Sequence, residues 1–132
     1  MFSYERPVRF EDVDAASIVF FPRFLGYCHE AMEAMLAPVR GGYAGLVVDR
    51  RLGLPAVHVE ADFKSPLRFG DVARISVVVE RIGRSSCTLR YEIVRARDAA
   101  VVATIHHVVV LSDLGTLTST PLPEDVRTVR QT

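Results

Sequence analysis

Apolar residues recur every three or four positions between residues 22 and 37, which is the spacing of one face of a helix. The positions that form this face are Phe24, Leu25, Cys28, Ala31, Met32, Met35 and Leu36. Pro22 suits the first turn of a helix, and Pro38 stops one. The pattern therefore predicts a helix over residues 22–37.

The chain changes to strict alternation after Pro55. Apolar residues occupy one set of alternate positions, namely Val57, Val59, Ala61 and Phe63. Polar residues occupy the other set, namely His58, Glu60, Asp62 and Lys64. A period of two predicts a strand with one face in water, here over residues 57–64. A shorter alternation over residues 4–11 predicts another strand ahead of the helix.

Three further extended runs follow, at about residues 71–82, 86–97 and 100–112. The connections between them are short, and short connections join neighbouring antiparallel strands. The last run is apolar on both faces, which predicts a central position in the sheet. It also places His106 and His107 on opposite faces of one strand.

The remaining segments are interpreted as connections. Residues 38–55 are rich in glycine, with a short helix over residues 43–50 as one option, and the tail after Pro121 is expected to form one or two helical turns. The order of one strand, one helix and four strands predicts a single α+β domain over residues 1–132. In this domain a five-stranded antiparallel sheet is expected to wrap around one long central helix.

Composition excludes several classes of function. The 132 residues are 49% hydrophobic, which suits one packed core. Because the formal net charge is zero, the uniformly basic surface of a general nucleic-acid binder is absent, and we expect no nucleic-acid partner. No stretch is long enough to span a membrane, and the first residues carry charge and a proline where a secretion signal needs an apolar run. We therefore expect a cytoplasmic protein without a membrane partner.

Cysteine and histidine spacing indicates no metal site. Cys28 and Cys87 are far apart in sequence, so neither a disulfide framework nor paired metal ligands are expected. His58, His106 and His107 lack partners at metal-ligand spacing. We expect neither a metal nor an organic cofactor.

Two segments carry a resemblance to a known family. Residues 9–24, with the sequence RFEDVDAASIVFFPRF, resemble the 4-hydroxybenzoyl-CoA thioesterase family of hotdog proteins. The shared pattern is an aromatic residue, two aspartates one residue apart, two small residues, an aliphatic pair, two aromatics and a helix. Residues 63–71 and 83–86 are similar to the second characteristic region of that family. The resemblance implies the hotdog fold and an acyl-CoA thioesterase that releases free acid and CoA from a small, medium-chain or aromatic acyl-CoA.

The resemblance also implies a catalytic pair. Asp14 stands at the position of the catalytic carboxylate, as nucleophile or general base, and the backbone N–H of Phe21 stands where the thioester carbonyl is polarised. The first N–H groups of a helix lack partners inside the helix and carry the positive end of its dipole, so the chemistry agrees. The alternative is that Asp14 is a capping or turn residue. Asp12 is expected to make a structural hydrogen bond or salt bridge, and Ser17 replaces the glycine that family members commonly have.

Substrate-binding residues are expected in both of the segments that carry the resemblance. Phe20, Phe21 and Phe24 either line an apolar acyl pocket, where Ser17 adds a hydroxyl, or belong to the core. A second set, Arg84, Ser85 and Ser86, forms a tight turn that either contacts the CoA phosphates or is an ordinary hairpin connection.

Hotdog sites typically lie between protomers, so the resemblance implies a homodimer or homotetramer, with residues 57–64 as the edge strand that pairs with its symmetry mate. His29 and Glu30 either approach a neighbouring site or are solvated. A noncatalytic acyl-CoA binding or sensing module on the same fold is the alternative function. A hotdog hydratase or dehydratase is less favoured, because no His and Asp pair precedes Pro22.

Overall fold

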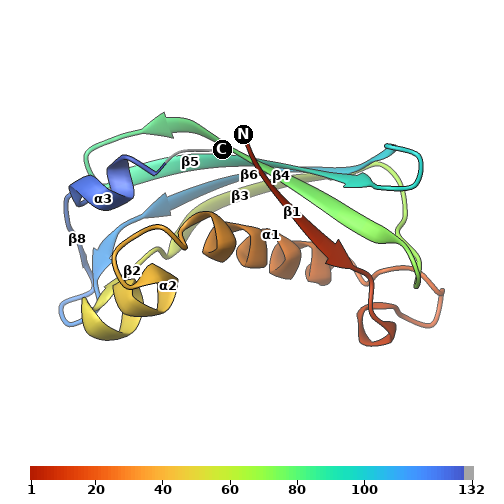
Figure 1. Ribbon diagram of the computed structural model, residues 1–132, viewed down its shortest axis with the longest axis horizontal. Helices are drawn as coiled ribbons and strands as arrows, with labels where there is room; N and C mark the ends of the chain where they lie inside the picture. The colour runs from red at the N-terminus through yellow and green to blue at the C-terminus, as the bar shows by residue number, and fades with distance from the viewer. Residues whose placement is uncertain (130–132) are drawn as a thin grey trace.

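The structure is a computed structural model that describes residues 1–129. Five strands form one antiparallel sheet in the order β1-β4-β5-β6-β3. The strands are β1 (Phe2–Pro7), β3 (Ala56–Phe63), β4 (Val72–Ile82), β5 (Ser86–Arg95) and β6 (Val101–Val110). The sheet arches over α1 (Pro22–Met35), as Figure 1 shows. The predicted five-stranded antiparallel sheet is confirmed, and β6 is an interior strand, as predicted, between β5 and the edge strand β3.

The main helix begins at Pro22 as predicted and ends at Met35. Five of its six buried residues lie on the predicted apolar face, namely Phe24, Cys28, Ala31, Met32 and Met35. Tyr27 is also buried although it was not predicted to be, and Leu25 of the predicted face is 45% exposed. The structure does not, however, have one long central helix, because α1 has only 14 residues. The other helical segments are shorter still: η1 (Phe10–Asp12), α2 (Gly42–Ala44), η2 (Gly45–Asp49) and α3 (Glu124–Arg127).

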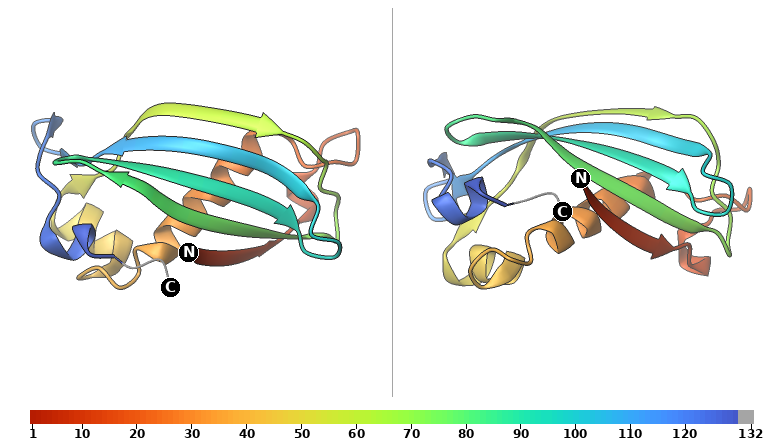
Figure 2. Two further views of the ribbon diagram at one scale, coloured as in Figure 1. Left: turned by 90° about the horizontal axis from the view of Figure 1, so that it is seen from above. Right: turned by 45° about the horizontal axis from the view of Figure 1, so that its top comes forward.

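The two edges of the sheet are β1 and β3, which lie on opposite sides in Figure 2. This confirms the predicted edge position of residues 57–64. The prediction of a single wet face is wrong, because all eight residues of β3 are exposed. The apolar side chains of Val57, Val59 and Phe63 are 61%, 42% and 49% exposed, since β3 pairs on one side with β6 and no other strand among residues 1–129 pairs with its outer edge.

The first strand differs from the prediction at both ends. It begins at Phe2 and stops at Pro7, and the chain then turns through η1 where residues 8–11 were expected to continue the strand. The cause is local, because the Asp12 carboxylate accepts the backbone N–H of Arg9 at 2.8 Å and closes the turn. A small second sheet of β2 (Leu52–Gly53), β7 (Ser112–Asp113) and β8 (Thr118–Ser119) was not predicted at all.

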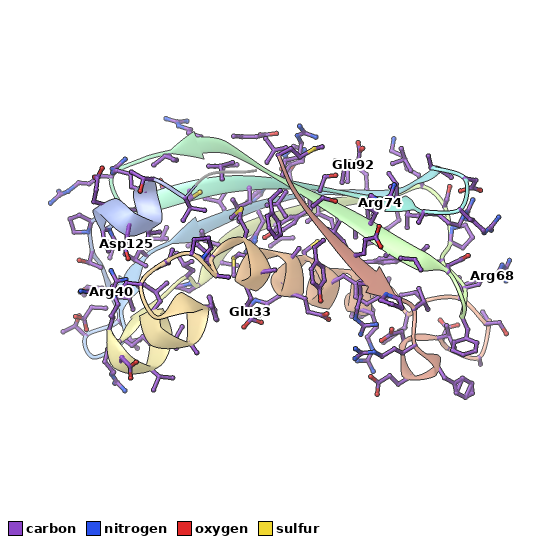
Figure 3. The ribbon with its side chains drawn as sticks, in the orientation of Figure 1. Glu33, Arg40, Arg68, Arg74, Glu92 and Asp125 are labelled. Carbon is purple, nitrogen blue, oxygen red and sulfur yellow. The ribbon has the colours of Figure 1, made fainter. Side chains whose placement is uncertain are left out.

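At the end of the molecule that holds α3, one ion pair and a backbone hydrogen bond meet at Asp125. Asp125 accepts hydrogen bonds from Arg50 Nη1 at 2.7 Å and Nη2 at 3.0 Å, and from the backbone N–H of Arg40 at 3.2 Å. Figure 3 labels Arg40 and Asp125 at this end and Arg68 at the opposite end. Within residues 1–129, no helix has the length and apolar character needed to cross a bilayer.

Candidate active site

The segment between β1 and α1 folds back on itself as a tight hairpin. Val13 pairs with Val19, the Asp14 N–H donates to the Ile18 carbonyl at 3.0 Å, and the Ser17 N–H donates to the Asp14 carbonyl at 2.9 Å. Ser17 has φ 66°, in the left-handed region. Hairpin loops of this length end on a left-handed residue, for which glycine carries no steric cost. Ser17 therefore keeps a backbone conformation that suits the glycine of the family pattern, and bears the strain of a Cβ there.

The Asp14 side chain is exposed at the tip of this hairpin. Its Oδ1 accepts the backbone N–H of Ala16 at 2.8 Å, which is the bond of a turn residue. Its Oδ2 has no hydrogen-bond or ion-pair partner among residues 1–129. The structure is thus compatible with both predictions for Asp14, the turn residue and the catalytic carboxylate, since one oxygen holds the turn and the other is free to meet a ligand.

Asp12 lies beneath the hairpin and is fully buried. Its Oδ2 accepts three hydrogen bonds, from Arg6 Nη1 at 2.9 Å, Arg9 N at 2.8 Å and the Tyr27 hydroxyl at 2.8 Å. Burial alone raises the pKa of Asp12, but the bonds from Arg9, Tyr27 and Arg6 outweigh it and hold that pKa below its ordinary value. The predicted structural role of Asp12 is confirmed, because this ionised carboxylate joins β1, the hairpin and α1.

Glu30 extends the same network along α1. Its Oε1 accepts the Tyr4 hydroxyl at 2.9 Å and Arg6 Nε at 3.1 Å, so Glu30 bonds to β1 of its own chain. His29 lies beside it but does not join the network. The His29 Nε2 is 3.3 Å from an Oε2 of Glu33, which Figure 3 shows projecting from α1 away from the sheet.

The start of α1 offers an unpaired donor. The Phe21 backbone N–H has no hydrogen-bond acceptor in the described part of the chain, and Pro22, the first helical residue, has no N–H. An unpaired N–H at this point combines with the positive end of the helix dipole. The arrangement suits an oxygen atom that gains negative charge during a reaction.

An apolar groove runs beside this donor. Its volume is about 590 Å³, and its lining includes Ile18, Phe21, Phe24 and Phe63. Phe24 fits both the predicted core role and the predicted pocket role, because its side chain is 5% exposed in the core and also lines the groove. Phe20 does not line it, but its ring centroid is 5.4 Å from that of Phe21.

The turn formed by Arg84, Ser85 and Ser86 lies at the other end of the molecule. Arg127 Nη2 in α3 donates to the Gly83 carbonyl at 3.0 Å, and the Leu122 N–H donates to the Arg84 carbonyl at 2.9 Å. Figure 2 shows the β4–β5 turn opposite the hairpin that precedes α1. Within one chain, the structure therefore separates these three residues from Asp14. The Arg84 side chain is exposed and has no ion-pair partner among residues 1–129.

A second cavity, which the sequence did not indicate, lies farther along α1. It has a volume of about 210 Å³ and is lined by Leu25, His29, Val59, Tyr91 and His107, among others. The Tyr91 hydroxyl is 3.2 Å from His107 Nδ1. The alternation of β6 was the available signal, because it places His107 on the face toward α1 and His106 on the other face, beside Glu80.

Several known proteins are similar to this chain in sequence and in architecture. The sequence model of the Thioesterase-like superfamily matches residues 8–129. The chain is 33% identical over 125 residues to a 1,4-dihydroxy-2-naphthoyl-CoA hydrolase of Nostoc punctiforme, covering 95% of this chain and 83% of that protein. Its structure is similar to a 1,4-dihydroxy-2-naphthoyl-CoA thioesterase from Synechocystis, with TM-score 0.88 and 30% identity over 97% of this chain and 93% of that one. It is also similar to a gentisyl-coenzyme A thioesterase, with TM-score 0.85 and 29% identity over 96% and 99% of the two chains.

Proposed function

Since the chain belongs to the thioesterase-like superfamily and is an acyl-CoA thioester hydrolase, we propose that it hydrolyses aromatic acyl-CoA thioesters through Asp14. The observation that carries this proposal is the hairpin before α1. It holds a carboxylate with one free oxygen and leads directly to an unpaired N–H at the helix start. The preference for aromatic acyl groups is supported by the named relatives, whose substrates are thioesters of hydroxylated aromatic acids.

The reaction requires a nucleophile and a site for the oxyanion. Asp14 either takes a proton from water as the water attacks the thioester carbonyl, or attacks the carbonyl itself and forms an anhydride that water then opens. In both routes the carbonyl oxygen gains negative charge, which the Phe21 N–H and the dipole of α1 stabilise. The C–S bond breaks as the resulting adduct collapses, which gives the free acid in the first route and the anhydride in the second, and CoA leaves as a thiolate that takes up a proton.

The acyl group is assigned to the groove that begins at the helix start. Phe21 and Phe24 line this groove, and Phe20 packs against Phe21. Ser17 places a hydroxyl on the same hairpin as Asp14, where it contacts the bound thioester. This apolar lining suits an aromatic ring better than a charged or strongly hydrated group.

We propose that two chains pair through β3. Its unpaired edge and its exposed apolar side chains are the features that sheet extension by a second copy covers. Pairing the same strand antiparallel about a two-fold axis reverses the second molecule end for end. The β4–β5 turn of one protomer then lies at the same end of the joined sheet as Asp14 of its partner.

This arrangement gives Arg84, Ser85 and Ser86 a role at the partner's site, as contacts to the phosphates or pantetheine of CoA. Arg84→Ala is expected to raise KM for acyl-CoA at low salt, because an exposed charge contact is screened by ions. It should leave KM unchanged for the corresponding acyl-N-acetylcysteamine, which lacks the nucleotide. Equal effects on both substrates would remove Arg84 from the nucleotide contact.

The test of the proposed function is a hydrolysis screen over aliphatic and aromatic acyl-CoAs, followed by Asp14→Asn on the best substrate. The variant is expected to fold normally and to lose roughly a hundredfold or more in turnover, the scale of a lost positioned base. Glu11→Gln removes a neighbouring exposed carboxylate and serves as the matched control, with activity close to wild type. Wild-type turnover in Asp14→Asn would exclude this mechanism. Binding without hydrolysis of any acyl-CoA would favour a noncatalytic binding module.

A further inference from the structure

The cavity between α1 and β3 has an apolar wall and one polar corner. Leu25, Val59 and Ile105 supply apolar surface, while His107 and Tyr91 meet at 3.2 Å in its lining, and His29 also lines it. Val59 lies opposite His107 in the pairing of β3 with β6, so the polar corner is close to the exposed edge of the sheet.

This cavity continues the line of the proposed active site. Phe21, Leu25 and His29 are spaced four residues apart and follow one face of α1, and the first lines the groove while the other two line the cavity. On the facing strand, Phe63 lies at the groove and Val59 at the cavity. Eight helical residues span about 12 Å. The groove and the cavity therefore occupy successive positions along the space between α1 and β3.

The hydrogen bond between Tyr91 and His107 determines which polar group a ligand meets at this corner. The Tyr91 side chain is fully buried, and His107 Nδ1 is the one partner of its hydroxyl within residues 1–129. A buried hydroxyl that lost its acceptor would leave a donor unsatisfied, so the Tyr91 O–H donates to Nδ1. Burial, reinforced by nearby His29, lowers the pKa of His107 and keeps the ring neutral.

A neutral imidazole that accepts at Nδ1 carries its proton on Nε2. The Nε2 of His107 has no partner in the described part of the chain, and the ring lines the cavity. The polar corner thus presents one N–H donor, held in orientation by Tyr91, at the end of an apolar space. A donor in such a place matches a single oxygen on an otherwise apolar group.

We infer that the His107–Tyr91 corner is a specificity subsite that binds a hydroxyl on the aromatic ring of the acyl group. The inference rests on the proposed function, because the thioester carbonyl must lie at Phe21 for the ring to extend toward His107. Along this path the far edge of the ring approaches the corner. The inference therefore assigns a hydroxyl at ring position 3 or 4 to this donor, and one at position 2 to the side of the carbonyl.

The experiment compares kcat/KM for benzoyl-CoA with the values for its 2-, 3- and 4-hydroxy derivatives. The wild-type protein is expected to prefer the better of the 3- and 4-hydroxy substrates over benzoyl-CoA by about tenfold, the size of one buried hydrogen bond. His107→Leu should abolish this preference, so that the ratio of the kcat/KM values for the hydroxylated and unsubstituted substrates falls to about one. Tyr91→Phe, which removes only the orienting hydroxyl, should reduce the preference. His106→Leu is the matched control, since its side chain is on the opposite face of β6, and should keep the full preference.

The possible outcomes distinguish a failure of the subsite from a failure of the proposed function. If aryl-CoAs are hydrolysed but the ring hydroxyl gives no advantage, or His107→Leu retains it, the subsite is excluded and the thioesterase stands. If no acyl-CoA is hydrolysed, the proposed function fails, and calorimetric binding of 3- and 4-hydroxybenzoate against benzoate decides the subsite. A preference for a hydroxylated acid that disappears in His107→Leu supports it, and equal binding of the acids overturns it. If His107→Leu does not fold, the same binding measurement is made with Tyr91→Phe instead.

Discussion

Tyr27 donates its hydroxyl hydrogen to Asp12 Oδ2 at 2.8 Å, so the second turn of α1 is bonded to the base of the hairpin that carries Asp14. The same hairpin is held from the other side, because the Phe20 N–H donates to the Asp12 carbonyl at 2.9 Å. Asp12 therefore fixes the hairpin through its side chain and its backbone. The position of Asp14 relative to the helix start depends on this buried residue.

Tyr27→Phe is expected to lower the free energy of unfolding by about 1.5–3 kcal/mol, because it removes a buried hydrogen bond to an ionised group. Urea denaturation measures this loss. Tyr4→Phe is the matched control, since its hydroxyl bonds to the partly exposed Glu30, and its loss should be smaller. Equal losses in the two variants would show that the buried bond to Asp12 stabilises the fold no more than the partly exposed bond to Glu30.

Ser17→Gly is expected to stabilise the fold by about 0.5–1 kcal/mol, because relief of left-handed strain exceeds the added entropy of the unfolded chain. Ala16→Gly, one residue earlier and without positive φ, should destabilise it. Thermal unfolding of the two variants tests this difference in sign, and a loss of stability in both would show that Ser17 is unstrained. A rise in thioesterase activity in Ser17→Gly would further show that the serine limits the site.

The Arg50–Asp125 pair predicts a loss of stability in acid. Hydrogen bonds from Arg50, helped by the Arg40 N–H, lower the pKa of Asp125 from 3.8 to about 2. A carboxylate with a depressed folded-state pKa stabilises the fold above its unfolded pKa, and this contribution disappears as pH falls from about 4 through about 2.

Asp125→Asn should therefore be less stable than wild type at pH 6, by about 1 kcal/mol because the pair is partly exposed, and the two should converge near pH 2. Denaturation curves across this range give the difference. Glu5→Gln, which breaks an exposed pair with Arg74, should differ little from wild type at any pH. A gap between Asp125→Asn and wild type that persists unchanged at pH 2 would assign the effect to something other than the carboxylate charge.

The exposed apolar face of β3 predicts a dimer at micromolar concentration, which sedimentation velocity can measure. Val57→Asp should weaken this dimer, because it places a charge on an apolar face that the second copy covers. Val48→Asp is the matched control, since Val48 is 70% exposed but lies in η2, outside the edge strand. A fully active monomer of the wild type would contradict the paired arrangement.

Local patterns predicted the elements of this fold well. The period of three and four residues located α1, because it reflects the buried side of a helix, and the alternation after Pro55 located β3, because a period of two is that of an extended strand. The alternation could not reveal that all eight residues of β3 are exposed, since the exposure of an edge strand depends on what the rest of the fold packs beside it. The strands β2, β7 and β8 have two residues each, which is too short for any period to appear.

The site was predictable only where neighbouring residues form it. The hairpin from Asp14 to Ser17 is local, and its sequence predicted an acidic turn before a helix. The bond from Tyr27 to Asp12 and the contact of Tyr91 with His107 join residues 15 and 16 positions apart on different elements. Such contacts are fixed by the packing of α1 and the strands, which no single segment encodes.

The placement of Asp14 and Arg84 at opposite ends of one chain has a genetic consequence when two chains share each site. In a mixed dimer of Asp14→Asn and Arg84→Ala protomers, one site combines both substitutions and the other combines the two unchanged residues. Two individually defective proteins should thus complement each other after subunit exchange, with one fully wild-type site restored per mixed dimer. If each site were built from a single chain, mixing would give only the average of the two activities.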